Sequence, residues 1–150
     1  MSLLYNLNDE LKAAMRAKDS IKLEALRAIR SEVLLFQTSS KEAASMSEDQ
    51  EIKLLQRLVK QRKDSSAIYK DQNREDLATL EEDQAAVIST FLPEQLTSKE
   101  IEKIVSSIIS KTGAEGMKHM GKVMGIASKE MAGKADGKTI STIVKQKLSS

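Results

Sequence analysis

The chain has 150 residues, with 24 lysines and arginines against 22 aspartates and glutamates, one histidine and no cysteine. The missing thiols exclude disulfides, thiolate metal sites, iron–sulfur clusters and a cysteine nucleophile. No apolar run approaches the ~20 residues that a membrane span needs, so no membrane segment is expected. The first residues lack the basic and long apolar stretches of a signal peptide, and we expect a cytoplasmic protein.

Residues 1–37 predict two helices, because their apolar residues recur at steps of three and four. The first apolar stripe is Leu4, Leu7, Leu11 and Met15. Asp19 is expected to cap the second helix, whose stripe is Leu23, Leu26, Ile29, Val33 and Phe36. Residues 38–46 continue no such stripe, and we predict a loop there.

Two further helices are predicted before residue 92. Ser47 and Gln50 have the spacing of a capping box, which marks the start of the third helix. Its inward residues are predicted to be Ile52, Leu55, Leu58 and Val59, with Ile68 and Tyr69 near its end. Asn73 is expected to cap the fourth helix, whose stripe is Leu77, Leu80, Gln84, Val87, Ile88 and Phe91.

Pro93 is the only proline, and it predicts a boundary because proline disfavours helical geometry in the residue before it. Three shorter helices are predicted after it. The first begins at a second capping box, Thr97 and Glu100, and ends at Gly113. The second is expected to end at Gly133, and the third to begin at Asp136. The sequence therefore predicts an all-α protein, with a four-helix unit in 1–92 and a three-helix unit in 93–150.

Charge is distributed unevenly between these units. Residues 1–92 contain 14 basic and 16 acidic side chains, whereas residues 97–150 contain ten lysines and five acidic side chains. A basic region indicates either an anionic partner or a solvated surface. The sole histidine, His119, has no recognisable catalytic partner, and no metal-ligand or cofactor motif is present. We therefore expect no catalytic residues, no metal and no cofactor.

The predicted sixth helix carries the candidate binding residues. Gly121 and Gly125 lie four residues apart inside it, where each costs ~1 kcal/mol relative to alanine. Either another helix packs closely there, or the backbone of a partner, such as a phosphate, approaches. Lysines follow the same side of the helix and the next turn: Lys118, Lys122, Lys129, Lys134 and Lys138. They form either a solvated face or a surface that binds phosphates without reading bases. Methionines on the same helix suit a core or a binding groove.

Three segments in this order resemble the GatB/YqeY family: residues 92–96 (LPEQL), 121–125 (GKVMG) and 133–137 (GKADG). Residues 1–4 (MSLL) and 60–65 (KQRKDS) are similar to freestanding YqeY-type proteins. In this family, a related helical domain forms the tail of the GatB subunit of tRNA-dependent amidotransferases. The tail contacts the body of the tRNA and is not where transamidation occurs.

The resemblance implies a non-catalytic, RNA-facing accessory module with tRNA as its partner. The Gly121–Leu148 region would supply the contact, and the N-terminal helices would supply a scaffold or a protein-binding face. One alternative is an adaptor that binds a protein through methionine-rich and acidic surfaces and has no RNA role. A glutamine-dependent carbon–nitrogen ligase is the least favoured function, because the chain lacks the activation and amidase parts of those enzymes.

Overall fold

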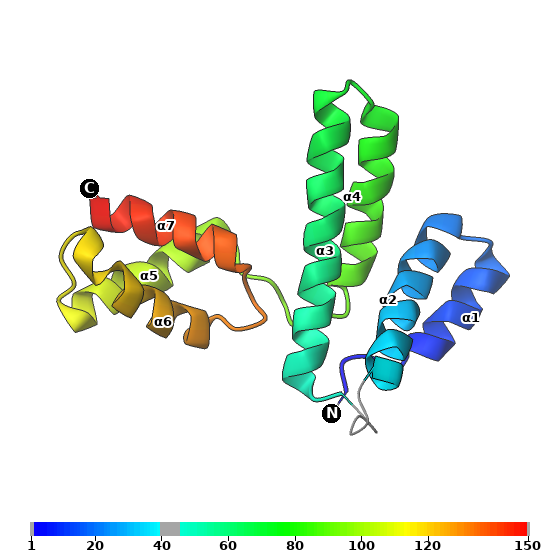
Figure 1. The fold of residues 1–150 in the computed structure, drawn as a ribbon, viewed down its shortest axis with the longest axis horizontal. Coiled ribbons are helices and arrows are strands. Elements are labelled where there is room, and N and C mark those ends of the chain that lie inside the picture. The colour runs from blue at the N-terminus through cyan, green and yellow to red at the C-terminus, as the bar shows by residue number, and fades with distance from the viewer. Residues whose placement is uncertain (1, 40–45, 150) are drawn as a thin grey trace. The chain divides into compact units, whose positions relative to one another are not determined.

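The computed structural model describes residues 2–39 and 46–149, and these residues contain helices and turns but no strand. The prediction of an all-α protein is confirmed. The chain divides into two compact units, Met1–Leu92 and Pro93–Ser150 (Figure 1). Each unit has its own cluster of buried apolar side chains.

The N-terminal unit contains α1 (Leu7–Ala17), α2 (Ser20–Ser39), α3 (Glu48–Asp71) and α4 (Glu75–Ser89). The helices α3 and α4 form a long antiparallel pair, α2 packs against α4, and α1 packs against α2 (Figure 1). Leucine, isoleucine and alanine dominate the core. Its most completely buried side chains are Ala25, Leu26, Ile29, Leu55 and Ile88.

Local capping signals place the helix starts in this unit. The Ser47 hydroxyl accepts a hydrogen bond from the Gln50 N–H at 3.2 Å, and the Gln50 side chain accepts one from the Ser47 N–H. Asp19 Oδ1 accepts from the Lys22 N–H at 3.1 Å, which confirms its capping role. Helix α2 continues to Ser39, so the predicted loop is wrong at residues 38 and 39. Residues 40–45 of that prediction lie outside the described residues.

The predicted cap at Asn73 is wrong. Asn73 adopts φ 59°, and the residue at the N-cap of α4 is Arg74, whose side chain does not cap the helix. Asparagine tolerates left-handed backbone geometry better than most residues, and here it reverses the chain between α3 and α4. The Arg74 guanidinium instead contacts the Asp76 carboxylate in the first turn of α4 at 3.1 Å.

Three predicted core residues of this unit lie at the surface. Met15 is 57% exposed, because Ala14 takes the inward position after Leu11 on α1. Ile68 is 57% exposed and Leu80 is 44% exposed. Both lie on stretches of α3 and α4 where neighbouring positions, Ser66 and Ala78, face the partner helix instead. Apolar periodicity alone does not show which side of a long helical pair remains uncovered.

The C-terminal unit contains α5 (Ser98–Thr112), the 3₁₀ turn η1 (Met117–His119), α6 (Met120–Glu130) and α7 (Gly137–Ser149). Its most buried side chains are Val105, Val123, Ala127, Met131 and Val144. Three of the methionines in this region pack in or against this core, whereas Met117 is exposed. Helix α6 ends at Glu130, three residues before the predicted stop at Gly133, because residues 131–134 form a turn.

The start of α5 provides a test of local stability. The Thr97 hydroxyl accepts from the Glu100 N–H at 3.2 Å and closes a capping box. We expect Thr97→Ala to lower the free energy of unfolding of the C-terminal unit by ~1 kcal/mol, since one N–H of the helix start loses its acceptor. Ser106→Ala, at an exposed position within α5, is the control and should change stability by much less. Chemical denaturation followed by circular dichroism measures both.

Candidate nucleic-acid interface

Helix α6 separates a buried side from an open side. Val123 and Ala127 are fully buried against α5 and α7, and Met131 follows them into the core just after the helix. Met124 and Ile126 are partly buried at the edge of the core, and the opposite side of the helix is exposed. At ~100° per residue, positions 121, 125 and 128 share one outward strip of the helix, and all three are exposed.

The two glycines in that strip are not explained by helix packing. A Cβ atom built on Gly121 or Gly125 would meet no heavy atom within 4 Å, apart from its own helix backbone, in the described part of the chain. Close approach of another helix within this unit is therefore excluded as the reason for glycine at these positions. Gly125, in the middle of α6, retains a conformational cost that nothing in the unit offsets.

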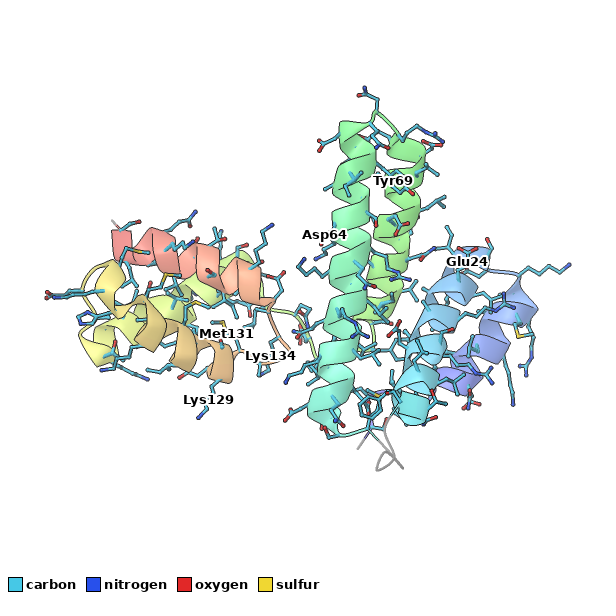
Figure 2. The ribbon with its side chains drawn as sticks, in the orientation of Figure 1. Glu24, Asp64, Tyr69, Lys129, Met131 and Lys134 are labelled. Carbon is cyan, nitrogen blue, oxygen red and sulfur yellow. The ribbon has the colours of Figure 1, made fainter. Side chains whose placement is uncertain are left out.

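Lysines border the glycine strip. Lys122 and Lys129 are seven residues apart, two helical turns, and therefore lie above one another beside Gly125. Lys118 lies in the preceding 3₁₀ turn, Lys134 in the turn after α6, and Lys138 near the start of α7. Figure 2 shows Lys129 and Lys134 near the end of α6. The structure thus places Lys122 and Lys129 with the glycines on one helix, and the other three on the adjoining turns.

These five lysines have no ion-pair partner among the described residues, unlike Arg57 and Lys70 on α3. All five are exposed, and none forms an ion pair within the described residues. In the N-terminal unit, Arg57 contacts Glu32 at 2.6 Å and Lys70 contacts Glu82 at 2.6 Å. The hydrogen bond from Lys70 lowers the pKa of Glu82, with help from the Ser66 hydroxyl. The positive charge of the five lysines on and beside α6 is therefore not neutralised by an ion pair within the described residues and can attract an external anion.

Both ends of α6 are fixed by hydrogen bonds. His119 Nδ1 accepts from the Glu115 N–H at 2.7 Å and ties the preceding turn to the start of the helix. At the other end, the Gln95 amide donates to the Gly133 carbonyl at 2.8 Å, and the Leu96 N–H donates to the Lys134 carbonyl at 2.8 Å. The only histidine therefore has a structural partner, as expected for a residue at a helix start.

Sequence reasoning missed the role of Gln95. Its segment, residues 92–96, stood out as a boundary at Pro93 and through its resemblance to a family motif, with no role given to Gln95. The structure shows that Gln95 joins that segment to the turn 38 residues later that carries Lys134. No local pattern predicts such a contact, because it joins residues far apart in the chain.

Neither a metal-binding cluster nor a membrane-spanning helix is found in the described residues. No group of three or more histidine, cysteine, aspartate or glutamate side chains in residues 2–39 and 46–149 could hold a metal ion. In the same ranges, no helix is both long and apolar enough to cross a membrane.

Fold and site together define an all-helical module with a lysine-bordered, glycine-lined helix on its C-terminal unit. Residues 4–148 match the family described as Yqey-like protein. The chain belongs to this family, and the expected membership is confirmed.

Named relatives support the family membership. The protein "Altered inheritance of mitochondria protein 41, mitochondrial" of Vanderwaltozyma polyspora is 32% identical over 122 residues, 77% of this chain and 65% of that protein. Its namesake in Pyrenophora tritici-repentis is 31% identical over 136 residues, 89% of this chain and 73% of that protein. The matched part of the chain therefore spans about two thirds of the length of these relatives: 65% of the Vanderwaltozyma polyspora protein and 73% of the Pyrenophora tritici-repentis protein.

A third relative is a much larger protein. One subunit of the "Glutamyl-tRNA(Gln) amidotransferase" of Thermococcus gammatolerans is 39% identical over 59 residues, which are 39% of this chain and 9% of that protein. The similarity therefore concerns a small part of the larger protein, and this chain is related to a module within it.

Proposed function

We propose that the protein is a non-catalytic accessory module that binds tRNA through the outer side of α6. One observation carries this proposal: exposed glycines with no neighbouring atoms lie beside exposed lysines with no ion-pair partner in the described residues. Without side chains, the helix surface at Gly121 and Gly125 permits a sugar–phosphate backbone to approach closely. The lysines beside it supply the positive charge that phosphates require.

The composition of the C-terminal unit favours recognition of the backbone over recognition of bases. Residues 93–150 contain no phenylalanine, tyrosine, tryptophan or arginine. Stacking on single-stranded bases uses aromatic side chains, and the rigid, forked donor geometry suited to bidentate recognition belongs to arginine. Lysine binds phosphate as a point charge. Binding should therefore be salt-dependent and similar for different tRNAs.

The relatives give this proposal its ligand. One of them is named as part of an amidotransferase for Glutamyl-tRNA(Gln), and tRNA is the ligand that we carry over to this chain. Carbon–nitrogen ligase activity remains the least favoured function, because the chain lacks the activation and amidase parts of those enzymes. A cytoplasmic location remains part of the proposal, although two relatives have the word mitochondrial in their names.

A protein-binding adaptor without an RNA role is the second candidate. Its methionine-rich surface is reduced in the structure, because Met120, Met124 and Met131 pack in or against the core. Met117, 46% exposed, is what remains of that surface on η1 and α6.

Alanine at the glycine positions tests the proposal directly. We expect Gly125→Ala to raise the free energy of unfolding of the C-terminal unit by up to ~1 kcal/mol, since alanine favours the helix and its methyl group meets no atom. The same change should weaken tRNA binding, because it fills the approach to the helix backbone. Gly121→Ala, in the first turn of α6, should gain less stability but also weaken binding.

The measurement is a fluorescence anisotropy titration of labelled tRNA with the full chain at two salt concentrations, beside thermal denaturation of each variant. Ser110→Ala, at an exposed position on α5, is a control that should leave tRNA affinity unchanged. Negligible tRNA binding by the parent protein at low salt would favour the adaptor. Stabilised glycine variants that bind tRNA as tightly as the parent would show that the glycines are not part of the contact.

A further inference from the structure

The acidic side chains of the α1–α2 hairpin in the N-terminal unit are mostly bonded within the unit, whereas most of its basic side chains form no ion pair with described residues. Four of its five acidic side chains are bonded within the unit. Glu10 contacts Lys22 at 2.9 Å, Asp19 caps α2, Gln84 donates to Glu24 at 3.0 Å, and Glu32 contacts Arg57. Figure 2 shows Glu24 on α2, in the region facing α4. The fifth, Asp9, is exposed.

The basic side chains of the hairpin behave in the opposite way. Apart from Lys22, all are exposed and form no ion pair with any described residue. They are Lys12, Arg16, Lys18, Arg27 and Arg30. Spacings of three and four residues place Lys12 with Arg16 on α1, and Arg27 with Arg30 on α2. The sequence of the hairpin is almost neutral, but its outer surface is positive.

Large aliphatic side chains accompany these charges. Leu34 is 50% exposed, Leu35 is 60% exposed, and Met15 is exposed to a similar degree. Leu34 follows Arg27 by seven residues and Arg30 by four, so the three share one side of α2. Leu34 and Leu35 are adjacent, exposed residues near the end of α2, and a contiguous exposed apolar patch indicates an interaction surface.

We propose that the outer surface of the α1–α2 hairpin binds an acidic, amphipathic helix of a partner protein. Carboxylates of such a helix pair with Arg27, Arg30 and their neighbours, and its apolar side covers Leu34, Leu35 and Met15. Such a helix presents apolar residues at steps of three and four on one side and acidic residues on the other.

The composition of the surface favours a protein over the other anionic partners. Arginine and methionine are enriched at protein interfaces, and a phosphate backbone offers nothing to cover exposed leucines. The surface on α6, built from lysine and glycine, has the opposite composition. A membrane is less suitable, because the aliphatic side chains are few and only about half exposed.

The test uses the full chain and a synthetic peptide of about 18 residues, five helical turns, with leucines at helical spacing and glutamates elsewhere. A matched peptide carries lysine in place of each glutamate. Fluorescence anisotropy should show binding of the acidic peptide and not of the lysine peptide. Arg27→Glu together with Arg30→Glu should weaken that binding by about tenfold or more, and Leu34→Ser with Leu35→Ser should also weaken it.

Lys53→Glu together with Lys63→Glu is the matched control. It makes the same change of charge at exposed positions of α3 in the same unit, and it should alter the affinity by less than about twofold. Circular dichroism checks that each variant is folded, and Arg27→Gln with Arg30→Gln serves as a milder second variant.

Three results would overturn the proposal. The first is no binding of the acidic peptide, and the second is equal weakening by the α2 and α3 charge reversals. The third concerns a protein that does not bind the peptide but does bind phosphatidylserine vesicles or duplex RNA, and that loses this binding when Arg27→Glu and Arg30→Glu are introduced. That third result would identify a membrane or a nucleic acid as the partner of this surface.

Discussion

Replacing Lys122 and Lys134 together with glutamine is expected to weaken binding of several tRNAs alike, by about tenfold at low salt. Both side chains are exposed and without an ion-pair partner in the described part of the chain, so the change removes charge that nothing there neutralises. Each lost phosphate contact makes the slope of log affinity against log salt shallower by about 0.7 to 0.9. The double variant should therefore lose about 1.5 from that slope.

The control for this experiment is Lys99→Gln with Lys103→Gln. These lysines are also exposed and lie on α5 of the same unit, so the net charge changes equally. The affinity should fall by much less than in the first variant, and the stability of both variants should match that of the parent, since exposed lysines contribute little. Equal losses in the two variants would show diffuse attraction to a basic unit rather than binding at α6.

The second large effect concerns stability. Leu55 on α3 is fully buried in the core of the N-terminal unit, and we expect Leu55→Ala to lower the unfolding free energy of that unit by about 2–5 kcal/mol. Because alanine has a high helix propensity, the loss of unfolding free energy reflects the cavity and the missing side-chain contacts. Denaturant unfolding followed by circular dichroism measures it.

Ile68→Ala on the same helix is the matched control. Ile68 is more than half exposed, and the loss should be within ~1 kcal/mol. Similar destabilisation by the two changes would mean that the outer side of α3 is covered in solution, contrary to its exposure in the structure.

Sequence reasoning succeeded where the cause of a structure is local. The capping boxes at Ser47 and Thr97 involve residues three apart in the chain, so their hydrogen bonds follow from spacing alone. Gly113 ends α5 in the left-handed conformation that glycine permits. The predicted cap at Asn73 was wrong because asparagine is common both at helix caps and in left-handed turns, and only the packing of α3 on α4 decides between the two.

The candidate site was predictable in part. Lysine spacing along α6 is visible in the sequence, because helix geometry turns spacing into position. The open space over Gly121 and Gly125 is not visible, since it depends on where α5 and α7 pack. The positive surface of the α1–α2 hairpin was missed for the same reason. Contacts such as the hydrogen bond from Gln84 to Glu24 join residues 60 apart in the chain. They use the acidic side chain of the hairpin and give the arginines on α2 no ion-pair partner among the described residues.

The C-terminal unit closes its own hydrophobic core within residues 93–150. The residues that flank α6 are also held by hydrogen bonds from Glu115 and Gln95 of the same unit. A segment with these properties can be joined to an unrelated protein through one peptide bond, and the hydrophobic core of that protein need not change. Gene fusion therefore transfers such a segment as a folded unit. The relative of which 59 matched residues form 9% shows that a part of this chain has a counterpart within a much longer protein.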